Sequence, residues 1–302
     1  MENHKSFFWP QGLLIALVAL VSSFSLGLMM LVKPNTSEAQ SQQSVNEIAT
    51  SAKAGTQARI EGLRTTMLTS WQKQASAKGF AYAIPQSFLG ATIESAKLSP
   101  DKKVIALTFD DGPWPESTAQ VLDILKKNDI KGTFFVVGQN VKNFPDLTKR
   151  VVAEGHTIAN HTWHHWYHQM NPQTAAYEIE NTTNLVYQLT GVKTNLFRPP
   201  GGNMRNGVAA YARNSKYAII MWSSDSKDYS RPTVPKLINN VFRTAKPGGI
   251  VLLHDGGGNR SQTVEALPTI IENFRKEGYS FVTVPELLEI QEKEQKIAAN
   301  KK

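Results

Sequence analysis

The chain has 302 residues, enough for one large domain with extensions or for two small domains. Apolar residues make up 41% and charged residues 19%, which excludes a wholly disordered chain. There is no cysteine, so disulfides, thiolate metal sites and cysteine nucleophiles are excluded, and any metal must bind through His, Asp or Glu. The formal net charge is +8, but no nucleic-acid-binding motif accompanies it, and we expect no nucleic-acid partner.

The first expected element is a membrane segment at residues 7–32. Residues 12–32 carry no charge, and at about 1.5 Å per residue they just cross a hydrocarbon core of about 30 Å. A cleaved signal peptide is the alternative, although this stretch is longer than usual and ends without a small-residue cleavage site. We therefore expect residues 1–33 to form a transmembrane anchor that makes the membrane a partner of the chain.

Residues 34–99 are expected to form a linker and a stalk. Residues 34–54 are rich in Ser, Gln, Thr and Asn, which favours a solvated linker. Residues 58–78 place apolar side chains at spacings of three and four, which predicts a helix. The main domain is expected at residues 100–290, followed by a basic tail at residues 291–302.

The main domain alternates short apolar runs with amphipathic stretches. Strands are predicted at residues 104–109, 133–137, 156–160, 196–198, 218–223, 250–254 and 280–284. Helices are predicted at residues 117–127, 144–153, 172–189, 207–215, 234–244, 263–276 and 285–289. Seven such units predict an α/β fold with parallel strands, either a barrel or an open doubly wound sheet. Both architectures bind ligands at the carboxyl ends of their strands.

Ionisable side chains follow the predicted strands at just those ends. They are Asp110, Asp111, His161, His165, Arg198, Asp225, Asp228, His254 and Asp255. Because strand ends meet at one mouth of a barrel, these groups are expected to converge from distant parts of the sequence.

Four histidines within residues 161–168 indicate a metal site. Two histidines four positions apart face the same way on a helical turn, and both His161/His165 and His164/His168 have that spacing. Asp111 is the expected third ligand, which leaves an open position for water. The adjacent Asp110 would then act as a general base, and Arg198 is a candidate to compensate the paired carboxylates.

Five motifs make the chain resemble the polysaccharide deacetylases of the NodB-homology type, carbohydrate esterase family 4. The resemblance covers about residues 103–288, and the first two motifs together are highly specific. In order, the motifs are residues 108–113, His161-Thr162-x-x-His165, Arg198-Pro199-Pro200-Gly201, Asp225-x-x-Asp228-Tyr229 and Leu252-Leu253-His254-Asp255. The resemblance implies a distorted (β/α)7 barrel, which agrees with the number of predicted units.

The resemblance also implies the role of each site residue. Asp111, His161 and His165 would bind a divalent metal, usually Zn2+, with Co2+ or Ni2+ as alternatives. Asp110 would be the general base, held by Arg198, and His254 would be the general acid, oriented by Asp228. The Gly201 N–H would stabilise an oxyanion, and Tyr229 with Leu252 would border the acetyl pocket.

The implied activity is hydrolysis of N-acetyl groups on a β-linked N-acetylglucosamine polymer, such as peptidoglycan or a chitin-like oligosaccharide. An O-acetyl esterase, a glycan-binding pseudoenzyme and an unrelated zinc hydrolase are the alternatives. No obligate protein partner is evident. The domain would lie outside the cytoplasm, at the cell surface or in the periplasm, with secretion after cleavage as the alternative. Two departures from the family pattern, Tyr229 in place of Trp and Gly201-Gly202 in place of an aromatic, concern substrate fit.

Overall fold

A computed structural model of the chain describes residues 84–300, together with residues 55, 56 and 59. The expected anchor, the polar linker and nearly all of the expected stalk helix lie outside these residues. Within the described part of the chain, no helix combines the length and apolar character needed to cross a membrane.

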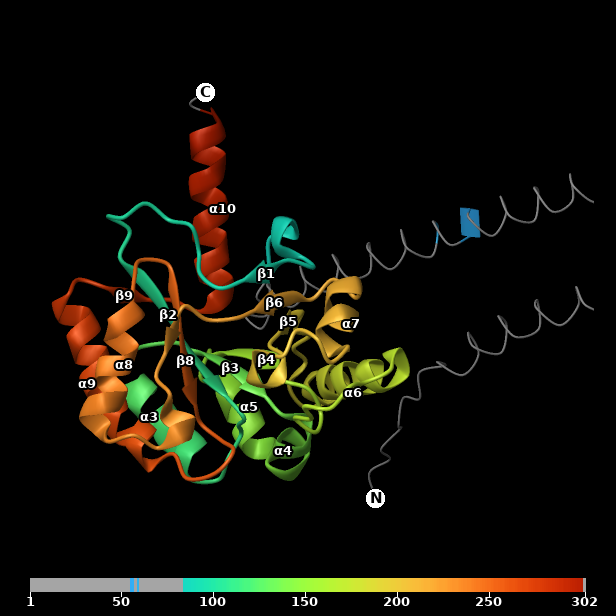
Figure 1. Cartoon of the computed structure of the whole chain (residues 1–302), viewed down its shortest axis with the longest axis horizontal. Helices are drawn as coiled ribbons and strands as arrows, with labels where there is room; N and C mark the ends of the chain where they lie inside the picture. The colour runs from blue at the N-terminus through green and yellow to red at the C-terminus, as the bar shows by residue number, and fades with distance from the viewer. Residues whose placement is uncertain (1–54, 57–58, 60–83, 301–302) are drawn as a thin grey trace, which may run out of the picture. The chain divides into compact units, whose positions relative to one another are not determined.

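A curled, parallel sheet forms the centre of the domain (Figure 1). Its strands follow the order β1-β6-β5-β4-β3-β2-β8-β7, and β9 pairs with β2 beside this path. Every strand-to-strand pairing described is parallel. The strands are β1 (Thr92–Ile93), β2 (Val104–Asp110), β3 (Thr133–Val136), β4 (Thr157–Asn160), β5 (Leu196–Phe197), β6 (Ala218–Ile220), β7 (Ser224–Asp225), β8 (Gly249–His254) and β9 (Ser280–Phe281).

The strand expected at residues 218–223 ends at Ile220 as β6, and a separate short strand, β7, begins at Ser224. β6 pairs with β5 on one side, whereas β7 pairs with β8 on the other. The side chain of Arg198 explains the interruption, because it donates hydrogen bonds to the carbonyl oxygens of Ile220 and Met221. The segment between β6 and β7 thus links the two ends of the sheet, which agrees with an incomplete barrel and not with an open doubly wound sheet.

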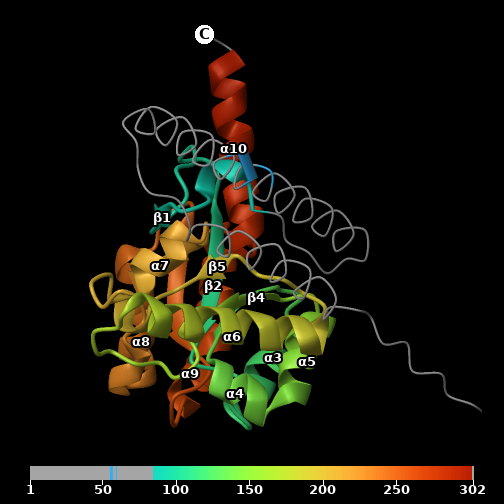
Figure 2. The same ribbon diagram turned by 90° about the vertical axis from the view of Figure 1, so that its right-hand side faces the viewer.

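Helices lie around the outside of this barrel, except that the last one projects away from it (Figures 1 and 2). They are α3 (Ser117–Lys127), α4 (Gly138–Asn143), α5 (Pro145–Ala153), α6 (Pro172–Thr190), α7 (Val208–Asn214), α8 (Val234–Thr244), α9 (Ser261–Lys276) and α10 (Val284–Asn300), with short 3-10 turns at Gln86–Phe88, Pro200–Gly202 and Asp228–Ser230. α6 illustrates local control of the boundaries. The Asn171 side chain accepts a hydrogen bond from the Thr174 N–H at its start, and Gly191 ends it with a φ of 73°.

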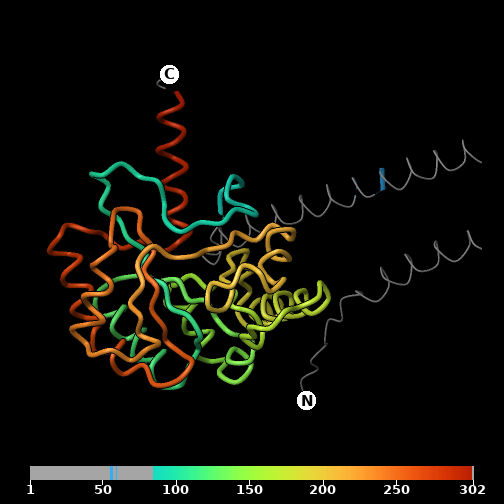
Figure 3. The backbone as a smooth tube through the Cα atoms, in the orientation of Figure 1, coloured from blue at the N-terminus to red at the C-terminus, as the bar shows by residue number. Residues whose placement is uncertain are grey.

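Two helices differ from the prediction. α4 was not predicted, and it begins directly after β3. α10 was predicted only for residues 285–289 but continues to Asn300. Its extension contacts residues that precede β2, since Gln291 accepts a hydrogen bond from the Lys97 N–H and Glu294 accepts two from Ser99. Figure 3 shows this segment running past α10 before it enters β2.

β2 contributes to two apolar clusters of the core through its alternating side chains. Ile105, Leu107 and Phe109 belong to the apolar cluster formed with α3, α5, α8 and α9. Val104 and Ala106 belong to a second cluster, which also contains residues of α10 and of the segment 84–96. That segment falls within the range predicted as linker and stalk, yet Ile84, Phe88, Ile93 and Ala96 are buried in the domain. By the same alternation, Thr108 and Asp110 face the barrel interior.

Candidate active site

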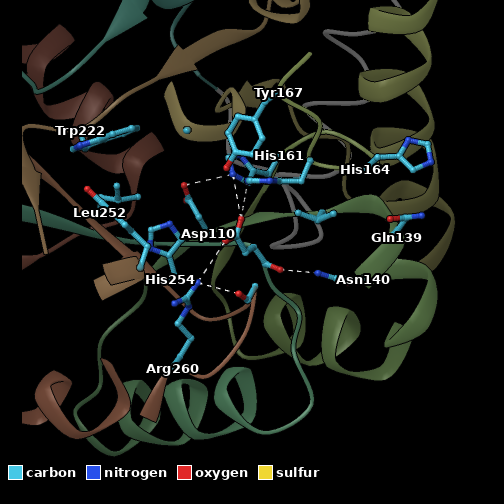
Figure 4. Close-up of a pocket in the computed structure, with 16 residues that line it drawn as sticks. Asp110, Gln139, Asn140, His161, His164, Tyr167, Trp222, Leu252, His254 and Arg260 are labelled. Carbon is cyan, nitrogen blue, oxygen red and sulfur yellow. Dashed lines mark hydrogen bonds and ion pairs between the residues drawn. The ribbon is translucent and has the colours of Figure 1, made fainter. Parts of the chain in front are cut away.

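A pocket of about 710 Å³ lies at the carboxyl ends of the strands (Figure 4). Most of the predicted site residues line it: Asp110, Asp111, His161, His165, Gly201, Tyr229, Leu252 and His254. The other two, Arg198 and Asp228, are buried and contact members of this set from behind. The structure therefore brings all ten predicted residues together.

Asp110 and His254 lie side by side at the ends of two neighbouring strands. They are register partners in the parallel pair β2–β8. Adjacent strands are about 4.8 Å apart, and register partners project from the same face of a sheet. A carboxylate and an imidazole therefore enter the pocket next to each other, although 144 positions separate them in the chain.

Asp111, His161 and His165 form a candidate metal site. One potential ligand atom from each lies within 4.8 Å of the others. Oδ1 of Asp111 is 3.1 Å from His165 Nε2 and 3.5 Å from His161 Nε2. This oxygen is buried and has no hydrogen-bond partner. Burial opposes ionisation, but the two imidazoles hold the pKa of the Asp111 carboxyl well below its ordinary range. A buried anionic oxygen facing two ring nitrogens fits a divalent cation.

The tautomer of His161 is fixed by the chain itself. Its Nδ1 donates a hydrogen bond to the carbonyl oxygen of Arg198 at 2.7 Å. Nε2 is consequently the unprotonated nitrogen of the neutral ring, and it is the atom that faces Asp111. Such a backbone partner on the far nitrogen is typical of histidines that bind metals.

The two histidines reach this site from a loop, so the helical turn predicted from their spacing is wrong. Residues 161–170 form bends without a helix. Thr162 and His165 have φ values of 69° and 62°, and Asp111 on the facing loop has 72°. Side chains hold the loop in this shape, because Asn160 Oδ1 accepts from the Thr162 N–H and Thr162 Oγ1 from the His165 N–H. Left-handed backbone at non-glycine residues is concentrated at sites with a specific task.

The alternative pair, His164 and His168, does not join Asp111. His164 Nδ1 is 2.5 Å from Oε1 of the buried Glu178, and its ring stacks on Trp166 with centroids 4.0 Å apart. His168 is exposed and donates from Nδ1 to the carbonyl oxygen of Gln169. The sequence spacing left both pairs open, and only His161/His165 lies with the carboxylate.

Arg198 is fully buried behind Asp110. Its Nη1 donates to Asp110 Oδ1 at 2.6 Å and to Thr108 Oγ1 at 2.9 Å. Its guanidinium also lies 4.0 Å from the centroid of the Phe135 ring. Burial lowers the pKa of Arg198 from its ordinary value, and the negative charge of Asp110 opposes that effect. The arrangement balances one carboxylate of the adjacent pair with a fixed cation.

Asp228 forms a second buried pair with His254. Its Oδ1 is 2.7 Å from His254 Nδ1, and its Oδ2 accepts hydrogen bonds from the His254 N–H and from Thr263 Oγ1. Burial opposes the charge of His254, but hydrogen bonding and attraction to Asp228 raise its pKa to about 9. For Asp228, burial acts in the opposite direction, while the same contacts leave the pKa of its carboxyl below its ordinary value.

Three further predicted residues border the open side of the pocket. The Tyr229 ring meets His254 edge-on, with centroids 5.8 Å apart, and its hydroxyl donates to Asp225 Oδ2. Leu252 is buried beside them at the end of β8. Gly201 lies in the turn Pro200–Gly202 with a φ of 57°.

Sequence reasoning missed several pocket residues. Arg260 donates to the carbonyl oxygens of Gly256 and Gly257, and its Nη2 is 4.0 Å from Asp111 Oδ2. Asn140, on the unpredicted α4, donates to the backbone carbonyl of Asp111 at 2.7 Å. Tyr167 and Trp222 add aromatic walls. Only Tyr167 carried a sequence signal, because it belongs to the aromatic run that follows His165.

Comparison with known proteins identifies the family. The polysaccharide deacetylase sequence model matches residues 97–220. A peptidoglycan-N-acetylglucosamine deacetylase of Bacillus cereus is 44% identical over 191 residues, which cover 62% of this chain and 89% of that protein. The chain belongs to the polysaccharide deacetylase family. As a member of this family it is a hydrolase of the deacetylase type.

Solved structures of the same family share the fold. A peptidoglycan N-acetylglucosamine deacetylase is 34% identical with a TM-score of 0.61, covering 65% of this chain and 92% of that one. A pseudoenzyme of carbohydrate esterase family 4 from Bacillus anthracis is 32% identical with the same TM-score, covering 67% of this chain and 70% of that one. The polysaccharide deacetylase fold therefore occurs with and without activity, and the residues of the site must carry the functional argument.

Proposed function

We propose that this protein hydrolyses N-acetyl groups on a β-linked N-acetylglucosamine polymer. Peptidoglycan is the substrate we favour, and chitin-like oligosaccharides are the second candidate. One observation carries the proposal. Asp110 and His254 end neighbouring strands as register partners, beside the convergent ligand set Asp111, His161 and His165. A base, an acid and a cation site thus share one pocket, as amide hydrolysis by water requires.

The cation site and Asp110 would divide the work of activating water. Asp111, His161 and His165 would hold a divalent cation, with Zn2+ as our proposal, whose Lewis acidity lowers the pKa of water and polarises a carbonyl. Arg198 occupies Oδ1 of Asp110. Oδ2 of Asp110 faces His161 and is the oxygen we assign to remove the proton from the attacking water. The charge-assisted hydrogen bond from Arg198 also holds this carboxylate in position.

His254 would complete the reaction as the acid. An amine leaves a tetrahedral centre poorly unless it is protonated, and a pKa of about 9 keeps His254 protonated near neutral pH. Nδ1 is engaged by Asp228, so Nε2 is the atom that would give its proton to the departing nitrogen. The Gly201 N–H would stabilise the oxyanion, and Tyr229 with Leu252 would enclose the acetyl methyl group. The products are acetate and a free amino sugar.

The choice of substrate and location rests on sequence and family. The Bacillus cereus relative is named for peptidoglycan N-acetylglucosamine, which motivates peptidoglycan as the polymer. The uncharged stretch at residues 12–32 motivates a membrane anchor with the domain on the outer side, where a wall polymer is accessible. Every residue that the mechanism uses is present in the pocket or directly behind it, which favours an enzyme over a glycan-binding pseudoenzyme.

Acetate release tests this proposal. The purified domain should release acetate from N-acetylglucosamine oligosaccharides and from isolated peptidoglycan, lose the activity with a chelator and regain it with Zn2+. Asp110→Asn keeps the side-chain shape but removes the base, so it should retain the metal and lose turnover. Acetylated xylan, which carries O-acetyl esters, is tested in parallel. Faster acetate release from it than from the N-acetylated glycans would favour the O-acetyl esterase. A metal-loaded protein that releases no acetate from any of these glycans would refute the proposal.

A further inference from the structure

Tyr167 and Gly201 come from different loops and meet at the edge of the pocket. A Cβ atom placed on Gly201 would lie 2.8 Å from Cε1 of Tyr167, closer than packed carbon atoms approach. The Tyr167 ring therefore occupies the space that any side chain at position 201 would need. The departure from the family pattern at Gly201 thus coincides with an aromatic ring delivered by the loop that carries the metal histidines.

The ring contacts its neighbours on one side although it is not buried. It meets the His165 ring edge-on, with centroids 5.1 Å apart, and Asn203 donates a hydrogen bond to the Tyr167 carbonyl oxygen. Even so, 59% of the residue is exposed, and it lines the pocket. An aromatic side chain that packs on one side and lines a pocket with the other can receive a ligand on its open face.

The ring also lies at the reacting end of the pocket. The Tyr167 ring contacts His165, and in Figure 4 it lies on the opposite side of the view from Trp222 and Leu252. A sugar that places its acetamide between Asp110 and His254 would therefore have this ring beside it.

We propose that Tyr167 is a substrate-binding residue whose ring packs against the sugar unit that loses its acetyl group. This inference rests on the proposed function. A β-linked glucosamine unit presents C–H groups on both faces of its ring, and such faces bury apolar surface against an aromatic ring. Gly201 contributes to this arrangement, because the absence of a side chain there leaves room for the Tyr167 ring.

Binding to an inactive parent isolates this role from catalysis. In an Asp110→Asn background, the affinity for an N-acetylglucosamine tetramer is measured by calorimetry together with metal content and melting temperature. Tyr167→Ala should weaken binding about tenfold, whereas Tyr167→Phe, which keeps the ring, should stay within about threefold of the parent. Gly201→Ala retains every atom of Tyr167 but displaces its ring, so it should also weaken binding. Tyr187→Ala removes an exposed tyrosine of α6 outside the pocket and should bind like the parent.

Each other result counts against the inference. Tyr167→Ala binding within twofold of the parent would refute it, and loss of metal in that variant would make the residue a support of the ligand loop instead. An equal loss in Tyr167→Phe would assign binding to the hydroxyl and not to the ring. The proposed function fails separately, if the unsubstituted protein neither binds nor deacetylates the tetramer.

Discussion

Replacing Asp228 with Asn tests whether Asp228 raises the pKa of His254, the proposed general acid. The side chain keeps its shape but loses the charge that, with its hydrogen bonds, raises the His254 pKa to about 9 from an ordinary 6.5. At 1.36 kcal/mol for each pKa unit, that difference corresponds to about 3 kcal/mol, and Asp228 is the largest favourable contributor ahead of Asp110 and Asp111. We therefore expect the His254 pKa to fall by about 1 to 2 in Asp228→Asn.

The pH profile of kcat reports this change. His254 must be protonated to act as the acid, so activity falls as pH rises through its pKa, and the alkaline limb of Asp228→Asn should lie about 1 to 2 pH units lower. The stability of the fold should also fall as the pH rises through the pKa of His254. Because the folded-state pKa of His254 is raised, the protonation of His254 stabilises the fold fully below about pH 6.5, and this contribution disappears as pH rises through about 9.

Asp228→Asn also changes the hydrogen bonds that Oδ2 of Asp228 accepts from its neighbours. An amide N–H₂ facing the His254 N–H and the Thr263 hydroxyl leaves one donor without an acceptor, which costs about 1–3 kcal/mol of stability. Urea unfolding at pH 6 measures this cost. An alkaline limb at the same pH in both proteins, with the variant folded and metal-loaded, would refute the reasoning.

Three further changes have defined outcomes. Arg198→Met leaves Asp110 as a buried charge without its partner, and urea unfolding should show a loss of about 3–5 kcal/mol. Burial lowers the pKa of His156 to about 4, so the parent should lose up to about 3 kcal/mol as pH falls from 6.5 to 4, and His156→Asn should lose less over that window. Asn140→Ala removes the hydrogen bond to the backbone of Asp111, and competition with a chelator should show metal affinity lowered by about tenfold.

Strand and helix patterns predicted much of the fold because they reflect local physics. The amphipathic stretches at residues 117–127 and 234–244 became α3 and α8 with the same bounds. The break between β6 and β7 could not be predicted in this way, because it depends on Arg198, which follows β5 and donates to the carbonyl oxygens of Ile220 and Met221. The length of α10 depends likewise on contacts with Lys97 and Ser99, nearly 200 positions away.

The candidate site was predictable to the extent that strand ends converge. Asp110 and His254 could be assigned to one mouth of the barrel from their positions after apolar runs, and their register then follows from β2 pairing with β8. Only the family resemblance selected His161 with His165, since the helical-turn argument left two pairs open. Arg260 offered no signal, because an arginine in a glycine-rich loop is ordinarily a surface residue, whereas here it is buried and binds that loop's carbonyl groups.

Arg198 connects three features that would otherwise be independent. Its guanidinium binds Asp110, its carbonyl oxygen fixes the tautomer of His161, and its other donors turn the backbone between β6 and β7. The side-chain contacts would be lost in Arg198→Met, but the carbonyl contact to His161 would remain. Metal affinity in that variant should therefore fall less than activity does. The difference between the two losses separates the effect of the guanidinium on Asp110 from the effect of the carbonyl group on His161.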